Sequence, residues 1–287
     1  MACLHVPRKV IWAVDAFEGA ANPPVRAAAQ LAGRLIEAFQ AKVEPVYVLN
    51  PAELNLSSEF SVPWVTRYRP YAERALTELM KRLGSEFGQF ETPHVLVQDS
   101  ASTARAIETL SDYATACDAD LIVVSTHGRS GMKRLLLGSF AETLILKSRV
   151  PVAAIGPELA SPIAEKPLSH ILFPTDLGDD AKATFYDVVE LARQTQAKIT
   201  LFHAIPHPIE PIVSSGVYLL GGGWVPVESY FADETRLRER RAEAWVRWAK
   251  QRGVEAEVAI EYRGVSIAQR IVEVARDRRT SCIVMEG

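Results

Sequence analysis

The feature that most constrains this 287-residue chain is one pattern of residues that occurs twice. Residues 9–15 (KVIWAVD) and 170–176 (HILFPTD) are short apolar runs that end in aspartate, and the two aspartates are 161 positions apart. The apolar runs 120–126 and 281–287 repeat at the same spacing. A repeat at a fixed, domain-sized spacing indicates two copies of one folding unit, so we expect two tandem domains.

Each copy alternates strand-like and helix-like segments. In the first copy, short apolar runs rich in β-branched residues predict strands, and apolar residues at three- and four-residue spacing predict helices. The predicted strands are 9–14, 43–49, 94–98, 120–125 and 151–155, and the predicted helices are 23–41, 72–87, the segment around Ile107–Cys117, and 139–148. Residues 50–69, which contain Pro51, Pro63 and Trp64, are expected to form an irregular loop.

Strands that are apolar on both faces and are separated by helices predict a parallel sheet covered by helices on both sides. The expected fold class is therefore α/β, with two tandem open parallel-sheet, Rossmann-like domains. We place the first domain at residues 1–156, a proline-containing linker at 157–168 and the second domain at 169–287. The second copy repeats the pattern only as far as its fourth strand, so we expect it to be incomplete at its C-terminus.

Composition excludes several classes of function. A net charge of -3 and a pI of about 6.1 argue against a general nucleic-acid binder. No apolar run approaches the ~20 residues that span a bilayer, so no membrane partner is expected, and a cytoplasmic location is the default. The three cysteines form no CxxC pair, which disfavours a disulfide framework or a zinc site. His203 and His207 lie among prolines and are not expected to bind a metal.

The segment after residue 125 combines flexible backbone with positive charge. Gly128, Gly131 and Gly138 permit close approach of backbone N–H groups to an anion, and Arg129 adds charge beside them. A helix is predicted to begin at Ser139, where unpaired N–H groups and the helix dipole attract phosphate. The pattern is neither a Walker A loop nor GxGxxG. The alternative is a strand–helix connection whose glycines serve turns and whose basic side chains are solvated.

The same stretch, residues 125–139 (STHGRSGMKRLLLGS), resembles the G-x2-G-x9-G-(S/T) motif of the universal stress protein family. Gly128, nine intervening residues, Gly138 and Ser139 fit the spacing, and Ser125 stands in place of the first glycine. The runs KVIWAVD, DLIVVSTHGRSG and SRVPVAAI follow the order of that family. The resemblance covers essentially the whole chain as two units.

The resemblance implies an adenine nucleotide alpha hydrolase-like fold that binds ATP or AMP, with or without Mg²⁺. Asp15 and Val48 would face the adenosine, although Asp15 is also a common turn former at a strand end. The candidate residues on the phosphate side are Ser125, His127, Gly128, Arg129, Gly138, Ser139 and Phe140. In the second copy Asp176 and Ala204 match the base-side positions, but a complete second site is not expected.

The functional expectation is a regulatory stress-response module that binds an adenine nucleotide without fast turnover, because no catalytic constellation is evident and at most slow ATP hydrolysis is implied. The alternative is a protein-interaction scaffold that needs no nucleotide. The expected partners are an adenine nucleotide and unidentified proteins. The resemblance further implies a homodimer or an intrachain pseudo-dimer, paired through the fifth strands of the two units.

Overall fold

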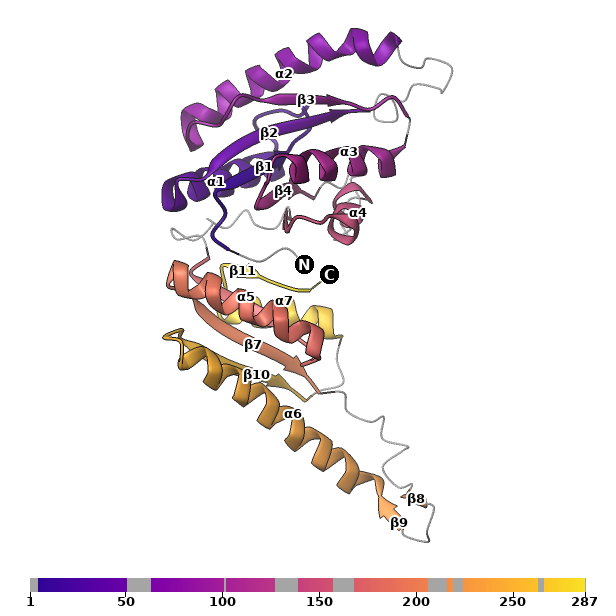
Figure 1. The fold of residues 1–287 in the computed structure, drawn as a ribbon, viewed down its shortest axis with the longest axis vertical. Coiled ribbons are helices and arrows are strands. Elements are labelled where there is room, and N and C mark those ends of the chain that lie inside the picture. Colours follow the sequence, from indigo (N-terminus) through magenta and orange to yellow (C-terminus); the bar gives the residue numbers. More distant parts are fainter. Residues whose placement is uncertain are drawn as a thin grey trace. The chain divides into compact units, whose positions relative to one another are not determined.

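A computed structural model describes residues 5–50, 63–100, 102–126, 139–156, 168–205, 216–218, 224–262 and 266–286. Contacts within the chain separate two compact units, residues 1–167 and residues 168–286. Each unit contains its own parallel sheet, and each is considered by itself below (Figure 1).

The first unit is a five-stranded parallel sheet in the order β3-β2-β1-β4-β5. Its strands are β1 (Lys9–Ala13), β2 (Lys42–Leu49), β3 (His94–Val97), β4 (Leu121–Ser125) and β5 (Val152–Ile155). Its helices are α1 (Pro23–Phe39), α2 (Pro63–Phe87), α3 (Thr103–Ala116) and α4 (Ser139–Lys147). The predicted parallel α/β architecture is confirmed.

Alternating side chains of the strands build a core on each face of this sheet. Trp12 of β1 is fully buried on the face covered by α1 and α2, together with Leu35 and Leu76. Its neighbour Ile11 points to the opposite face, where it packs with Leu110 of α3. Helix α4 also packs into this second core. The period-2 alternation of a strand therefore explains why β1 reads as an unbroken apolar run.

Helix α2 begins earlier than the sequence predicted. Residues 63–69 were expected to be part of an irregular loop, but they are helical, and Pro70 lies inside the helix. The loop was predicted from Pro51, Pro63 and Trp64, and Pro70 in addition removes one intrahelical hydrogen bond. The helix continues through it because Tyr68 packs against the α1–α2 core and Ala72, one turn later, is fully buried. Tertiary packing here outweighs the local preference of proline.

The second unit has a four-stranded parallel sheet in the order β10-β7-β6-β11 and a short antiparallel pair, β8–β9, that the sequence did not predict. Its strands are β6 (His170–Pro174), β7 (Lys198–Ala204), β8 (Gly216–Tyr218), β9 (Trp224–Pro226), β10 (Ala256–Glu261) and β11 (Cys282–Ile283). Its helices are α5 (Asp179–Thr195), α6 (Val227–Lys250) and α7 (Ile267–Asp277).

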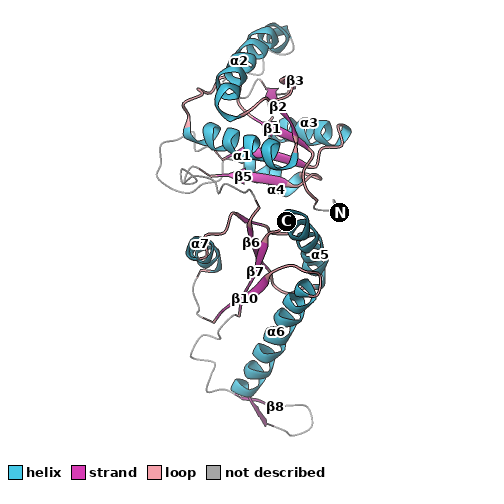
Figure 2. Cartoon of the chain, turned by 90° about the vertical axis from the view of Figure 1, so that its left-hand side faces the viewer, coloured by secondary structure: helices cyan, strands magenta, loops and turns pink. Residues whose placement is uncertain are grey.

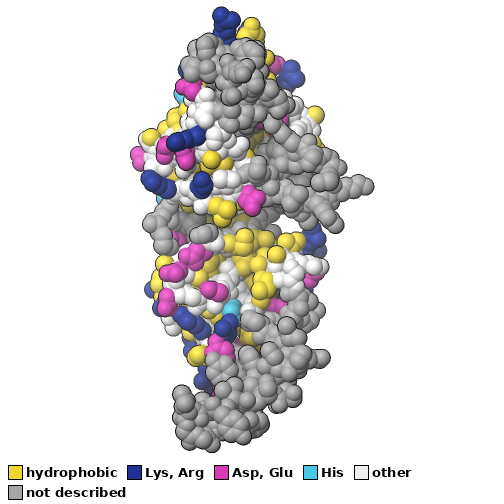
Figure 3. All heavy atoms as spheres, turned by 90° about the vertical axis from the view of Figure 1, so that its right-hand side faces the viewer, with side chains coloured by type: hydrophobic (Ala, Val, Ile, Leu, Met, Phe, Trp, Pro, Cys, Tyr) yellow, Lys and Arg dark blue, Asp and Glu magenta, His cyan; other side chains and the backbone are white. Residues whose placement is uncertain are grey.

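The two faces of the second sheet are covered unequally. Figure 2 shows α5 and α6 on one side and α7 on the other. On the first side Phe185 of α5 lies fully buried against Trp245 of α6, with ring centroids 5.2 Å apart. On the other side, Val274 is the residue of α7 that is buried. Apolar side chains consequently remain exposed on this unit, among them Ile267 and Val272 of α7 and Ile283 of β11. Figure 3 shows apolar side chains, in yellow, just below the middle of the view.

Candidate functional site at the carboxyl edge of the first sheet

The central strand of the first sheet stops before both of its neighbours. The last pairs of β1 join Ala13 to Val46 of β2 and to Val124 of β4. Strand β2 continues beside β3 to Leu49, and β4 continues beside β5 to Ser125. The carboxyl edge therefore has a notch over β1, at the place where successive connections run to opposite sides. Open α/β sheets bind their ligands at such a switch point.

Asp15 lies at the base of this notch because a turn leads the chain away there. One of its carboxylate oxygens, Oδ1, accepts a hydrogen bond from the Phe17 N–H at 2.9 Å, and its carbonyl oxygen accepts the Glu18 N–H at 3.2 Å. The Asp15 side chain is half-buried. Asp15 thus forms a turn in the structure, and its contact with a ligand stays a prediction.

Val48 forms one wall of the notch through its backbone. Its side chain is buried in the core with Ile107 and Leu110, so the isopropyl group is unavailable to a ligand. The Val14 N–H donates to the Val46 carbonyl oxygen at 3.0 Å, and the register between β1 and β2 ends there. Val48 comes two residues later on β2, where it pairs with Leu96 of β3 alone. Its peptide edge on the β1 side therefore faces the notch.

Ser125 and Thr126 form the opposite wall. Ser125 is buried and pairs with Ile155 of β5. The Thr126 N–H donates to the Ile155 carbonyl oxygen at 2.8 Å, and its hydroxyl donates to the same oxygen at 3.1 Å. These two bonds hold the chain against β5 at the point where it leaves the sheet toward the glycine-rich segment. The start of that segment is consequently fixed on one side of the notch.

The phosphate-side predictions fall partly outside the described residues. The structure does not describe His127, Gly128, Arg129 and Gly138, nor the side chain of Ser139. Helix α4 does begin at residue 139, as predicted. Phe140 is half-buried and packs against the core beneath α3 and α4. What the first turn of α4 can offer an anion is therefore its backbone N–H groups, which lack intrahelical acceptors.

The second unit repeats the base-side geometry. Strand β6 stops pairing with β7 at Pro174, while β7 continues beside β10 to Ala204. Asp176 Oδ1 accepts the Gly178 N–H at 2.7 Å, as Asp15 does for Phe17. A Cβ atom added to Gly178 would lie 2.9 Å from that oxygen, so a side chain at this position would require the Asp176 carboxylate to shift. The two predicted aspartates thus occupy equivalent turns.

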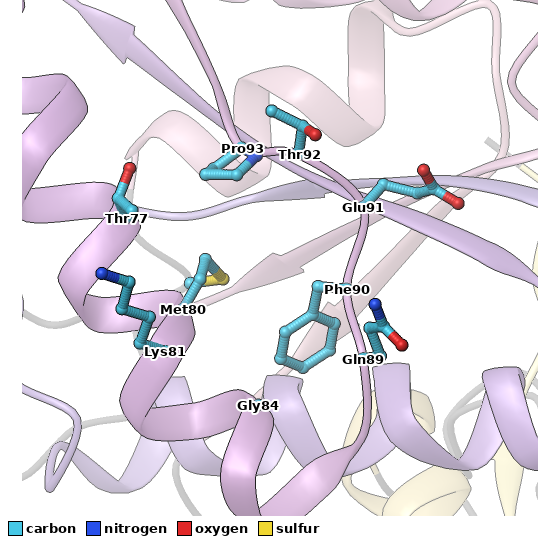
Figure 4. Close-up of a pocket in the computed structure, with 9 residues that line it drawn as sticks. All are labelled: Thr77, Met80, Lys81, Gly84, Gln89, Phe90, Glu91, Thr92 and Pro93. Atoms are coloured by element: carbon cyan, nitrogen blue, oxygen red, sulfur yellow. The ribbon is translucent and has the colours of Figure 1, made fainter.

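A separate hollow of about 390 Å³ lies at the other end of the first sheet, which the sequence did not indicate. Met80, Lys81 and Gly84 of α2 line one side, and Phe90 and its neighbours before β3 line the other (Figure 4). These residues precede β3, so the hollow belongs to the amino edge of the sheet, away from Asp15 and Ser125. It is shallow and open, and it contributes nothing to the carboxyl-edge site.

Over the described ranges, no three His, Cys, Asp or Glu side chains come together in a way that could hold a metal ion. None of the helices in those ranges is both long enough and apolar enough to cross a bilayer.

Comparisons with known proteins place the chain in a family. A model described as the universal stress protein family matches residues 7–156 and 167–286. A universal stress protein of Methanocaldococcus jannaschii is 26% identical over 129 residues, which are 45% of this chain and 72% of that protein.

Two solved structures match across both units. One is a universal stress protein from Archaeoglobus fulgidus, at 14% identity and a TM-score of 0.62 over 99% of this chain and 86% of that one. The other is a putative universal stress protein from Pseudomonas aeruginosa, at 13% identity and a TM-score of 0.54 over 97% and 82% of the two chains. At such identities these likenesses show the fold alone. Because the family model covers both units, this chain belongs to the universal stress protein family and carries two of its domains in tandem.

Proposed function

We propose that the first unit binds an adenine nucleotide, ATP or AMP, in the notch over β1, and that binding regulates partner proteins rather than supporting fast turnover. The observation that carries the proposal is the register. Strand β1 ends at Ala13, whereas β2 and β4 run on to Leu49 and Ser125. The ends of β2 and β4 therefore project beyond β1 at the switch point, where ligands of open α/β sheets bind.

The walls of the notch suit a nucleoside. The backbone of Val48 presents an N–H and a carbonyl on the side where β1 has ended, which suits hydrogen bonding to the edge of a base. The carboxylate of Asp15 can accept a hydrogen bond from an exocyclic amine or a ribose hydroxyl. Phosphates would then extend toward residues 127–138 and the N-terminus of α4, where the sequence places glycines and basic residues.

A regulatory role is favoured over catalysis by the chemistry of the site. Among the described residues, the notch contains one carboxylate, Asp15, and the threonine hydroxyl there is bonded to Ile155. Phosphoryl transfer needs metal-binding carboxylates or a positioned base in addition to phosphate contacts. We therefore expect binding with slow hydrolysis at most. Contact of the phosphates with the glycine-rich segment would change a surface that a partner protein reads.

The test is equilibrium titration of the full chain with ATP, AMP and inorganic triphosphate, with or without Mg²⁺. Asp15→Ala removes the proposed contact in the first unit, and Asp176→Ala removes the same turn from the second unit as a matched control. Losing a hydrogen bond to a charged group costs about 1.5–3 kcal/mol, so D15A should weaken nucleotide binding by roughly 10- to 150-fold. D176A should bind as tightly as the parent.

Gly138→Val should weaken ATP and triphosphate more than adenosine, because it obstructs the phosphate side and leaves the base side intact. Absence of nucleotide binding by the parent chain, or equal affinity of the parent, D15A and D176A, would refute the proposal. That result would favour the alternative, a protein-interaction scaffold that needs no nucleotide.

A further inference from the structure

A buried histidine in the second unit has one ring nitrogen without a partner. The side chain of His203 on β7 is 1% exposed. Its Nδ1 lies 2.8 Å from the carbonyl oxygen of Thr175, which can only accept, so Nδ1 carries the proton and donates. Its Nε2 is buried and has no hydrogen-bond partner among the described residues. The ring is therefore held as the neutral tautomer by a single bond to the chain that follows β6.

That bond acts on a short, constrained loop. The Thr175 N–H donates to the Phe202 carbonyl oxygen at 2.9 Å, and its hydroxyl accepts the Leu177 N–H at 2.9 Å. Leu177 is 2% exposed and has a φ of 66°, in the left-handed region that a leucine seldom adopts. Surrounding contacts must hold such a residue in place. The bond from His203 to Thr175 is one of these contacts.

The charges around His203 come from two elements. Burial lowers the pKa of His203, the bond to Thr175 opposes this, Arg238 of α6 lowers the pKa further and Asp176 raises it. Arg238 is paired with Glu234 at 2.8 Å, and at the start of α5 Asp179 is paired with Arg241 at 2.6 Å. Glu261 of β10 pairs in register with Ala204, next to His203 on β7, so its side chain points to the opposite face of the sheet. Arg238 and Asp176 are thus the two charges that act on the ring, with opposite effects on its pKa.

We propose that His203 is a pH-sensitive latch: its neutral ring holds the loop of residues 175–178, and protonation at Nε2 expels the ring and releases that loop. Protonation would place a second N–H in a buried position where the described residues offer no acceptor, and it would add a positive charge that Arg238 disfavours; both changes are costly in an apolar interior. The proposal does not depend on nucleotide binding. It concerns the carboxyl edge of the second unit, where Asp176 lies.

The direction of the pKa shift determines whether a fall or a rise in pH favours release of the loop. The pKa of His203 in the latched state lies below the ordinary value of about 6.5, so the released state binds the proton more readily. Acidification below about pH 6.5 therefore favours release. Each unit of difference in pKa between the two states permits a tenfold change in the opening equilibrium.

The first unit provides an internal comparison. The Val14 N–H donates to the Val46 carbonyl oxygen, and the Thr175 N–H donates to the Phe202 carbonyl oxygen in the same way. Tyr47 and His203 are the next residues on β2 and β7, so Tyr47 occupies the position in the first unit that His203 occupies in the second. Tyr47 is 4% exposed and packs edge-on against Phe17, with ring centroids 5.8 Å apart. A phenol does not change charge between pH 5 and 8. The corresponding turn of the first unit should therefore lack the latch.

The experiment measures hydrogen exchange of single amides in the full chain by NMR between pH 7.5 and 5.5, corrected for intrinsic exchange. The Leu177 and Gly178 amides should lose protection by up to about tenfold as the pH falls, the limit that a released-state pKa near 6.5 sets over this range. The Phe17 and Glu18 amides should not. His203→Asn keeps an N–H near the position of Nδ1 but cannot titrate in this range, so it should abolish the response. His170→Asn, which removes another histidine of lowered pKa, should leave it intact.

Constant protection of Leu177 and Gly178 in the parent chain would overturn the proposal, and so would an equal loss of protection in H203N. Should H203N fail to fold, the imidazole resonances of the parent decide instead. The His203 ring must then titrate together with the exchange of the Leu177 amide, and a ring that protonates while the loop keeps its protection contradicts the latch.

Discussion

The crossing of α1 and α2 depends on the absence of a side chain at Gly33. A Cβ atom at this position would lie inside van der Waals contact of the Phe87 carbonyl oxygen and 3.1 Å from the carbonyl carbon. The obstacle is backbone at the end of α2, so it cannot move as a side chain would. The Arg26 guanidinium lies 5.1 Å from the centre of the Phe87 ring and pairs with Glu86, which holds this end of α2 against α1.

Gly33→Ala therefore adds a clash and removes a helix penalty at the same time. Alanine is favoured over glycine in a helix interior by about 1 kcal/mol, whereas overpacking a tight contact costs about 1–3 kcal/mol. The matched control is Gly84→Ala in α2, because a Cβ atom added there meets nothing within 4 Å. The gain in helix propensity is common to both variants, so the difference in their free energies of unfolding, about 1–3 kcal/mol, reports the crowding at Gly33.

The assay is thermal unfolding of both variants and the parent, followed by far-ultraviolet circular dichroism and repeated in urea. For a unit of this size each kcal/mol corresponds to about 2–4 °C in Tm. G84A should thus melt roughly 2–12 °C above G33A and no lower than the parent. If G33A proved as stable as G84A, the helices would not be in the contact described, and this account of the α1–α2 packing would be refuted.

Two further predictions concern the stability of the first unit. The Asp120 carboxylate accepts hydrogen bonds from the N–H groups of Arg8 and Lys9 and pairs with His5, each at 2.7 Å. Burial raises the pKa of Asp120, but these bonds lower it more, so the net shift of the pKa is downward. Asp120→Asn should lower the free energy of unfolding by about 1–3 kcal/mol at pH 7. The difference in stability between this variant and the parent should shrink as the pH falls below about 4, because protonation of Asp120 then removes the same stabilisation from the parent. An equal difference at pH 7 and pH 3 would contradict this prediction. Leu110→Ala should cost about 2–5 kcal/mol in urea unfolding because the side chain is fully buried, whereas Leu146→Ala, at a position that is 72% exposed, should change stability by less than about 0.5 kcal/mol.

Several features of the fold were predictable from local sequence. The repeat of apolar runs ending in Asp15 and Asp176 predicted two similar units, and both aspartates occupy the same kind of turn. The strand and helix periods predicted the parallel sheets and the start of α4 at residue 139. Each of these depends on spacing along the chain, which a reader of the sequence can count.

Other features needed the tertiary structure. Helix α2 extends through Pro70 because Tyr68 reaches the core, and Gly33 is required because the carbonyl of Phe87, far along the chain, lies against it. The notch at the carboxyl edge exists because β1 ends its pairing before β2 and β4 do, and His203 is constrained because the carbonyl of Thr175 meets its ring. Periodicity is a local property, whereas strand register and close approach are set by contacts between distant residues. The sequence by itself therefore determined most of the strands and helices, but not the start of α2 or the β8–β9 pair, and only the tertiary packing decided the site.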